Sequence, residues 1–119
     1  MVTLVIHAPH YRAAQGAKSF HAVLATGIGD GYAIFQKDHA LLTQALLNPG
    51  CKVVLLEKDK RQLRAEGYLV HLLPTGKSTP QGVKRYDVVI RGLRVVPYKA
   101  EKLNHFGVGV YQQNSKVEN

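Results

Sequence analysis

The side chains of this sequence that could carry chemistry are above all cationic. Sixteen Lys and Arg residues stand against eight Asp and Glu residues, which gives a formal net charge of +8. Most of the excess lies in the second half of the chain, where the segment from Lys52 to Lys102 holds twelve basic and five acidic residues. Clustered positive charge attracts phosphate backbones and releases their counterions. The alternative interpretation is a generic soluble surface on which the extra charge only limits aggregation.

Two short motifs contain residues that could bind phosphate groups. Gly76-Lys77-Ser78 resembles the end of a Walker A loop, in which backbone amides wrap a phosphate and the lysine neutralises it. The first glycine of that motif would fall at His71, and a proline follows where a long helix should begin, so nucleotide hydrolysis is not predicted. Residues 27–31 partly match a dinucleotide fingerprint, but its third glycine would fall at Tyr32. A hairpin or a backbone anion nest is favoured there.

Six histidines raise the question of a metal site or a general base. A helical metal site needs two ligands three or four residues apart on one face. Only His7 and His10 are that close, and Pro9 between them keeps the pair out of a helix. We therefore expect no metal site and no cofactor, and a structural role for most of the histidines.

Length and composition indicate one domain that folds by itself. The chain has 119 residues, of which 45% are hydrophobic and 20% charged, as in ordinary globular proteins. The single cysteine, Cys51, excludes an internal disulfide and a zinc site built on cysteines, and favours a reducing, cytoplasmic location. Its place at the head of an apolar run predicts a buried, inert thiol. The apolar run at residues 2–6 is too short for a membrane span and has no basic residues before it, so we expect no membrane partner.

The elements that must position these side chains are mostly strands. Apolar runs rich in branched residues predict strands, and glycine or proline ends them, at residues 2–6, 20–26, 32–35, 51–58, 68–73, 86–96 and 108–111. Asp38 can cap a helix that Asn48, Pro49 and Gly50 end, and a short helix is possible at 98–105. Residues 75–84 read as a flexible surface loop. The domain is expected to span 1–111, with a disordered tail at 112–119.

This element order predicts an α+β, mostly β fold, a small antiparallel or mixed β-barrel with one or two short helices. The order of a short helix, the run Asn48-Pro49-Gly50-Cys51-Lys52-Val53-Val54-Leu55, a charged turn, Gly67-Tyr68-Leu69-Val70 and a late valine-rich strand resembles the PUA-like superfamily, which includes the PUA, EVE, ASCH and YTH groups. The likeness covers roughly residues 20 to 111. The chain departs from it at Cys51, where the family usually has Asp, and in lacking tryptophan and the Gly-x-Lys-x-x-Glu-x-Arg signature of ASCH domains.

The resemblance implies a module that binds RNA or DNA, with a small base-binding pocket and a basic rim around it, and we expect RNA rather than DNA. By position, the pocket would involve Thr26, Gly27, Gly29 and Tyr32. We expect the rim to consist of Arg61, Arg64, Lys84, Arg85, Arg91 and Arg94. Tyr86 and Tyr68 are further candidate surfaces for stacking unpaired bases, and the alternative for each tyrosine is core packing.

The geometry of the rim depends on Gly92. Arg91 and Arg94 would point to opposite faces of an ideal strand, since side chains alternate with period two. A bulge at Gly92 would bring both to one side.

Two other functions stay open. One is a small metal-independent ribonuclease or toxin-like enzyme, in which His21 or His71 acts as general base and an arginine stabilises the pentavalent phosphate. It needs two proton-transfer groups in one cleft, which the spacing does not indicate, so binding is favoured over catalysis. The other is docking on an acidic protein.

Overall fold

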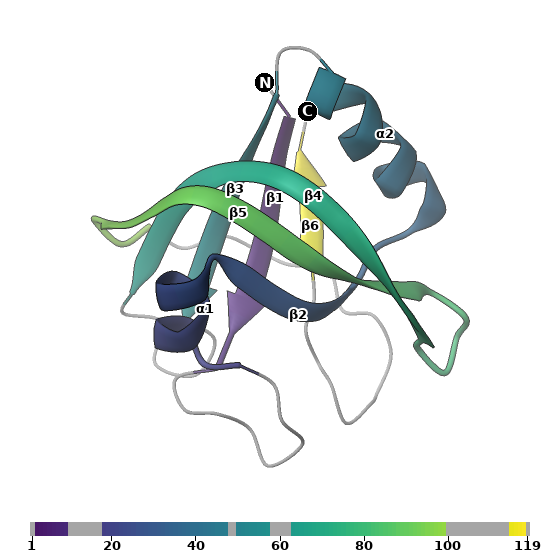
Figure 1. Ribbon diagram of the computed structural model, residues 1–119, viewed down its shortest axis with the longest axis horizontal. Helices are drawn as coiled ribbons and strands as arrows, with labels where there is room; N and C mark the ends of the chain where they lie inside the picture. Colours follow the sequence, from purple (N-terminus) through teal and green to yellow (C-terminus); the bar gives the residue numbers. More distant parts are fainter. Residues whose placement is uncertain (1, 10–17, 48–49, 58–62, 100–114, 119) are drawn as a thin grey trace.

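The computed structural model describes residues 2–9, 18–47, 50–57, 63–99 and 115–118. Six strands and two helices lie in these ranges (Figure 1), in the order β1 (Val2–Ala8), α1 (Phe20–Thr26), β2 (Ile28–Ala33), α2 (Gln36–Leu47), β3 (Cys51–Glu57), β4 (Arg64–Ser78), β5 (Lys84–Val96) and β6 (Ser115–Glu118). No helix among them is long and apolar enough to cross a membrane.

All six strands belong to one mixed sheet with the order β2-β5-β4-β3-β1-β6. Strands β1 and β3 pair in parallel, whereas every other pairing is antiparallel. The parallel pair is joined by a crossover that contains α1, β2 and α2. Its strands have the nearly continuous apolar runs that parallel strands inside a sheet require, and both were predicted from those runs. The fold is α+β and mostly β, as the sequence predicted.

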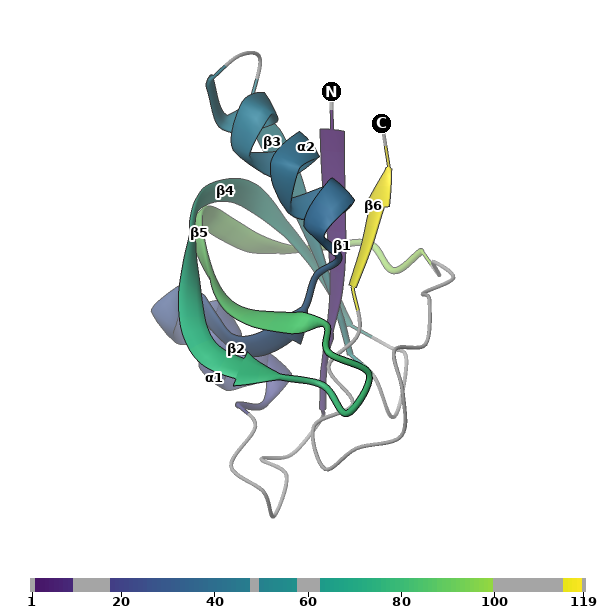
Figure 2. The same cartoon turned by 90° about the vertical axis from the view of Figure 1, so that its right-hand side faces the viewer.

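The prediction of a closed barrel was wrong. The long strands β4 and β5 arch over the rest of the sheet (Figures 1 and 2), but in the described part of the chain β2 pairs only with β5, and β6 only with β1. The join between β2 and β1 is a side chain: the Tyr32 hydroxyl donates a hydrogen bond of 2.7 Å to the His7 carbonyl. The two edges of the sheet, β2 and β6, do not pair with each other in the described part of the chain, so the sheet is open.

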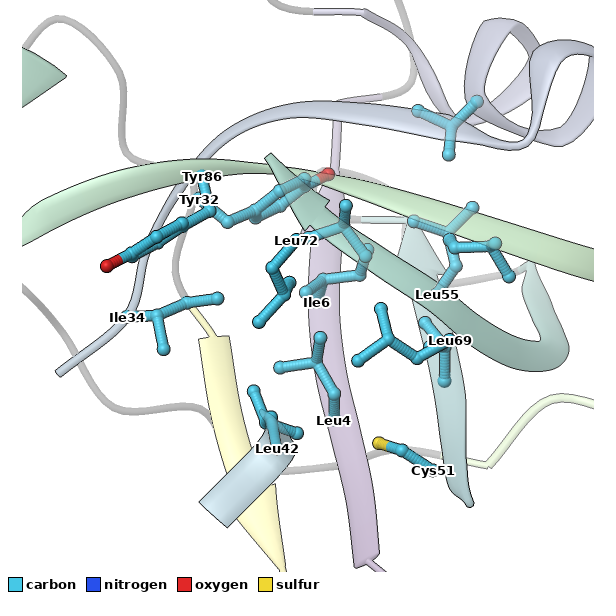
Figure 3. Close-up of a cluster of buried hydrophobic side chains, with 14 of the residues drawn as sticks. Leu4, Ile6, Tyr32, Ile34, Leu42, Cys51, Leu55, Leu69, Leu72 and Tyr86 are labelled. Atoms are coloured by element: carbon cyan, nitrogen blue, oxygen red, sulfur yellow. The ribbon is translucent and has the colours of Figure 1, made fainter. Parts of the chain in front are cut away.

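The core lies between the β1–β3 pair and the arch of β4 and β5 (Figure 3). Leu4, Ile6 and Leu55 meet Leu69 and Leu72 there, and both helices add apolar side chains. Cys51 is part of this cluster at 1% exposure, and burial raises the pKa of its thiol to about 11. The burial and the raised pKa agree with the predicted inert thiol.

Residues 20–26 form helix α1 instead of the predicted strand. Phe20, Val23 and Leu24 follow the spacing of one face of a helix, and Phe20 and Val23 are buried. The Ser19 hydroxyl accepts a hydrogen bond from the Ala22 amide and caps the helix. Gly27 ends it with a left-handed φ of 72°. Capping residues at both ends therefore outweigh the strand-like composition of a short apolar run.

Three other boundaries differ from the prediction. Helix α2 begins at Gln36, so Asp38 lies in its first turn and does not precede it. Strand β4 continues to Ser78 and β5 begins at Lys84, which reduces the predicted loop at 75–84 to a short turn. Residues 115–118, expected to be disordered, form β6 beside β1. The strand predicted at 108–111 and most of the helix predicted at 98–105 lie outside the described residues.

Candidate nucleic-acid interface

The glycine-rich segment predicted to form a base pocket is packed against β5. The Gly27 carbonyl accepts a hydrogen bond of 2.7 Å from the Ile90 amide, and a Cβ at Gly27 would lie 2.6 Å from the Ile90 carbonyl oxygen. A Cβ at Gly29 would lie 2.6 Å from the ring of Tyr32. Thr26 is exposed, but its hydroxyl donates back to the Ala22 carbonyl at the end of α1. These glycines serve close packing, not an open pocket.

Tyr32 itself is fully buried, which corrects its predicted role as a stacking surface. Burial, together with the nearby charge of Asp30, raises the pKa of its hydroxyl well above the usual range. Tyr86 is also buried, at 7% exposure, and stacks on His39 with ring centroids 4.6 Å apart. For both residues, core packing describes the side chain better than an exposed base-stacking surface does.

Two of the predicted rim arginines are buried and hold segments of the fold together. Arg64 is 6% exposed, and its guanidinium binds the Glu66 carboxylate at 3.0 Å and donates to the Lys99 carbonyl at 2.8 Å. Arg85 is 7% exposed and donates to the Gly31 carbonyl at 2.7 Å. Neither side chain lies on an exposed rim. Arg61 lies outside the described residues.

Arg91 and Arg94 do share a face of the sheet, as the hypothesis of a bulge at Gly92 required. Tyr68 is opposite Arg91 and Glu66 is opposite Arg94, so one residue of β4 faces two residues of β5 between these pairs. Gly92 has a φ of 64°, the left-handed conformation of a bulge glycine. Because Glu66 and Tyr68 are two residues apart and share a face, their partners Arg91 and Arg94 share it too.

The bulge lies close against the facing strand at Gly67. A Cβ at Gly67 would be 2.8 Å from the Arg91 carbonyl oxygen and 3.1 Å from the Leu93 Cα. The position therefore admits no side chain without a shift of the β5 backbone. Gly67 and Gly92 together fix the bulge, and with it the direction in which both arginines point.

Among the described residues, neither Arg91 nor Arg94 forms an ion pair with a carboxylate. Glu66 binds Lys52 at 2.8 Å and Arg64 at 3.0 Å. The hydrogen bond from Lys52 is the main reason that the pKa of the Glu66 carboxyl is lowered, and Arg64 adds to it. Glu66 is thus engaged by two other cations. Arg91 and Arg94 are both exposed.

Tyr68 gives this face an aromatic surface. Its side chain is 43% exposed, and the Arg91 guanidinium lies 5.0 Å from the ring centroid in a cation–π contact. Beside the ring is a hollow of about 400 Å³. The hollow is lined by Leu46, Leu47, Gly50, Cys51, Tyr68, Leu69, Val70 and Arg91. We call Tyr68, Arg91 and Arg94 the arginine platform.

The hollow was not predicted from the sequence. It lies where the end of α2 meets a second irregularity of the hairpin, between Leu69 and His71, and two of its lining side chains, Leu47 and Val70, are exposed. No local motif marks such a place, because it depends on how a helix and a bulged strand pack. The only available signal was Tyr68, which sequence alone could not separate from the two buried tyrosines.

The remaining candidates lie elsewhere. Lys84 is exposed at the other end of β5, apart from the arginine platform. His21 lies on α1 and His71 on β4, and neither lines the hollow beside Tyr68. Within the described ranges, no group of three or more His, Cys, Asp or Glu side chains is arranged to hold a metal ion.

Comparison of the chain with models of protein families, with curated proteins and with solved structures finds no match. The resemblance to the PUA-like superfamily therefore stays a prediction from the sequence.

Proposed function

We propose that this protein binds single-stranded nucleic acid, RNA rather than DNA, through the arginine platform and the hollow beside it. The observation that carries the proposal is the contact between Arg91 and the exposed ring of Tyr68, 5.0 Å apart, on a face that also holds Arg94. Unpaired bases stack on aromatic rings and on guanidinium planes, and phosphates bind arginine. The platform offers an aromatic ring, a guanidinium plane for stacking and arginines for phosphates within one exposed surface.

The electrostatics of this face favour an anionic partner. Glu66 is held by Lys52 and Arg64, so its charge is offset within the protein. Arg91 and Arg94 are among the basic residues that give the chain its net charge of +8. For a single strand, two phosphate contacts give a slope of about −1.4 in log affinity against log salt, or about a sevenfold loss between 50 and 200 mM.

The aromatic part supports a single strand over a duplex. In a duplex the base faces are covered by their neighbours, whereas an unpaired base can lie on the Tyr68 ring and reach into the hollow. One stacked base contributes about 1 to 3 kcal/mol. RNA presents unpaired bases in loops and ends, and its 2′-hydroxyl gives the platform a group that DNA lacks.

The test is a titration of labelled RNA oligonucleotides by fluorescence anisotropy at several salt concentrations. Arg94→Ala should weaken all sequences alike and reduce the steepness of the salt slope by about 0.7 if it loses one phosphate contact. Tyr68→Ala should weaken binding about tenfold and leave the slope nearly unchanged. Lys37→Gln, an exposed change of equal charge on α2, serves as control.

An affinity that does not change with salt concentration would contradict the proposal. So would equal losses of affinity in Arg94→Ala and Lys37→Gln. A DNA oligonucleotide of the same sequence shows whether the preference is for RNA. If the RNA is cleaved during the titration and His71→Ala or His21→Ala abolishes cleavage, a ribonuclease replaces the binding module as the function.

A further inference from the structure

The Gly76-Lys77-Ser78 segment takes no part in the arginine platform, yet it lines a hollow of its own. This hollow has a volume of about 250 Å³ and lies at the turn end of the β4–β5 hairpin. It is lined by Pro74, Gly76, Lys77, Ser78, Lys84, Arg85 and Tyr86. We call it the hairpin hollow.

The hairpin hollow is built by a bulge in β4. Between the pairs Pro74 with Tyr86 and Ser78 with Lys84, three residues of β4 face one residue of β5. The Thr75 hydroxyl fixes the extra residues, because it donates to the Arg85 carbonyl at 2.9 Å and accepts from the Lys77 amide at 3.1 Å. The bulge therefore has a defined conformation, and Lys77 and Ser78 have a defined position on it.

Gly76 gives the bulge its shape. Its φ is 78°, a conformation that side chains other than glycine adopt at a cost. A Cβ added at Gly76 would meet nothing within 4 Å, so backbone conformation and not crowding accounts for the glycine.

The charges around the hairpin hollow all have one sign. Lys77 and Lys84 are exposed, Arg85 is buried behind them at 7% exposure, and none of the lining residues is acidic. Arg85 is held in place by its hydrogen bond to the Gly31 carbonyl. Two exposed lysines and a lining without acidic residues favour an anion at the hollow.

Tyr86 supplies an apolar surface beside these cations. It is stacked on His39 of α2 with an interplanar angle of 23°, which fixes its orientation. Lys84 and Tyr86 are two residues apart on β5 and share a face. A ligand that contacts both needs an anionic group and a carbon skeleton attached to it.

We infer that the hairpin hollow binds a phosphate monoester, with Lys77 and Lys84 on the phosphate oxygens, the Ser78 hydroxyl as a further donor and Tyr86 against the esterified group. This site is separate from the arginine platform and does not rest on the proposed function. It also differs from a Walker A loop, because Ser78 is followed by a turn and a strand, not by a helix.

Two sources could supply the monoester: a free nucleotide, or the terminal phosphate of a nucleic acid strand. Adenosine 5′-monophosphate represents the first, and a 5′-phosphorylated RNA oligonucleotide the second. Adenosine and a 5′-hydroxyl oligonucleotide of the same sequence are the matched ligands without the phosphate monoester.

The experiment is an NMR titration of the ¹⁵N-labelled protein at constant ionic strength. Adenosine 5′-monophosphate should shift the amide signals of Lys77, Ser78 and Lys84, and adenosine should not. Lys77→Gln and Lys84→Gln should each weaken binding about fivefold, the upper range for one exposed ionic contact, and Lys37→Gln should leave it unchanged. Because these changes are at exposed side chains, the variants are expected to fold.

The inference is overturned if the nucleotide shifts no signal at the hairpin, or if all three lysine variants bind it equally. If the 5′-phosphorylated RNA binds more tightly than the 5′-hydroxyl RNA and Lys84→Gln removes the difference, strand ends are the source. If only the mononucleotide shows the effect, the source is a free nucleotide. Loss of 5′-hydroxyl RNA binding in Tyr68→Ala concerns the arginine platform alone, so each proposal can fail without the other.

Discussion

Two glycines with a left-handed backbone conformation, one at the end of α1 and one in the β5 bulge, lie in opposite surroundings. At Gly27 the backbone is pressed against β5, with 2.6 Å between a would-be Cβ and the Ile90 carbonyl oxygen. At Gly92 a Cβ would meet nothing within 4 Å, although the φ angles of the two residues, 72° and 64°, are nearly the same. Gly27 allows two backbone segments to pack closely, whereas Gly92 forms a bulge that places two exposed arginines on one face. A glycine in a sequence thus marks an unusual backbone without saying whether the site beside it is open.

The largest expected effect is that of Gly27→Ala. The added methyl group would clash with the Ile90 backbone, and the left-handed φ adds strain of about 1 to 2 kcal/mol. We expect the free energy of unfolding to fall by about 3 kcal/mol or more. Urea denaturation followed by circular dichroism measures this loss. A fall below about 1 kcal/mol would show that Gly27 is no more constrained than Gly92.

Tyr32→Phe should have the next largest effect. The change removes the hydrogen bond from the buried hydroxyl to the His7 carbonyl, the link between β2 and β1. One intramolecular hydrogen bond contributes about 0.5 to 1.5 kcal/mol, so we expect a loss of about 1.5 kcal/mol in the free energy of unfolding measured by urea denaturation. Tyr68→Phe is the matched control, because Tyr68 is 43% exposed and should lose almost nothing. Equal losses in the two variants would remove the distinction between the buried and the exposed tyrosine.

The loss of stability in Gly92→Ala can be compared directly with that in Gly27→Ala. The φ of 64° predicts a loss of about 1 kcal/mol in stability, with no steric contribution. Gly92→Asn should lose less, since asparagine tolerates this conformation better. If the bulge relaxes in the alanine variant, Arg91 and Arg94 no longer share a face, and RNA affinity should fall more than stability does. A loss as large as that of Gly27→Ala would contradict the contrast.

The smallest effect is expected at Glu66, which lies on the same face of the sheet as the arginine platform. Its pKa is lowered in the folded protein by Lys52 and Arg64, so its ionised form stabilises the fold above the pKa of the unfolded chain. This stabilisation disappears as the pH falls through the lowered pKa. Glu66→Gln should therefore cost about 0.5 kcal/mol at pH 7 and progressively less as the pH falls through the lowered pKa. A difference between the two proteins that does not change with pH would contradict this assignment.

Much of the fold could be predicted because its central strands contain runs of apolar residues. β1, β3 and β5 were found from such runs, and α2 from its apolar body and the residues that end it. α1 was missed because seven residues are too few to separate a helical spacing from a strand-like composition. The open sheet could not be predicted, since the order of the strands and the pairing of the edges depend on contacts between segments far apart in the sequence.

The candidate site could be predicted only where its cause is local. Gly92 between two arginines is a local signal, and the bulge follows from it. The burial of Arg64 and Arg85 is not local, because it depends on Lys99 and on Gly31 from a strand far away in sequence. The exposure of Tyr68, in contrast with Tyr32 and Tyr86, likewise follows from the pairing of three strands.

The pairing of β6 with β1 has a consequence for the order of assembly. Ile6 and Ser115 are register partners although more than a hundred residues separate them in the chain. Closing such a long loop costs conformational entropy, which is offset only after the intervening strands are in place. We therefore expect β6 to dock last during folding. Until then, one side of the apolar strand β1 is an unpaired edge, which another chain could occupy. The risk of aggregation in this protein is therefore concentrated in the last step of its folding.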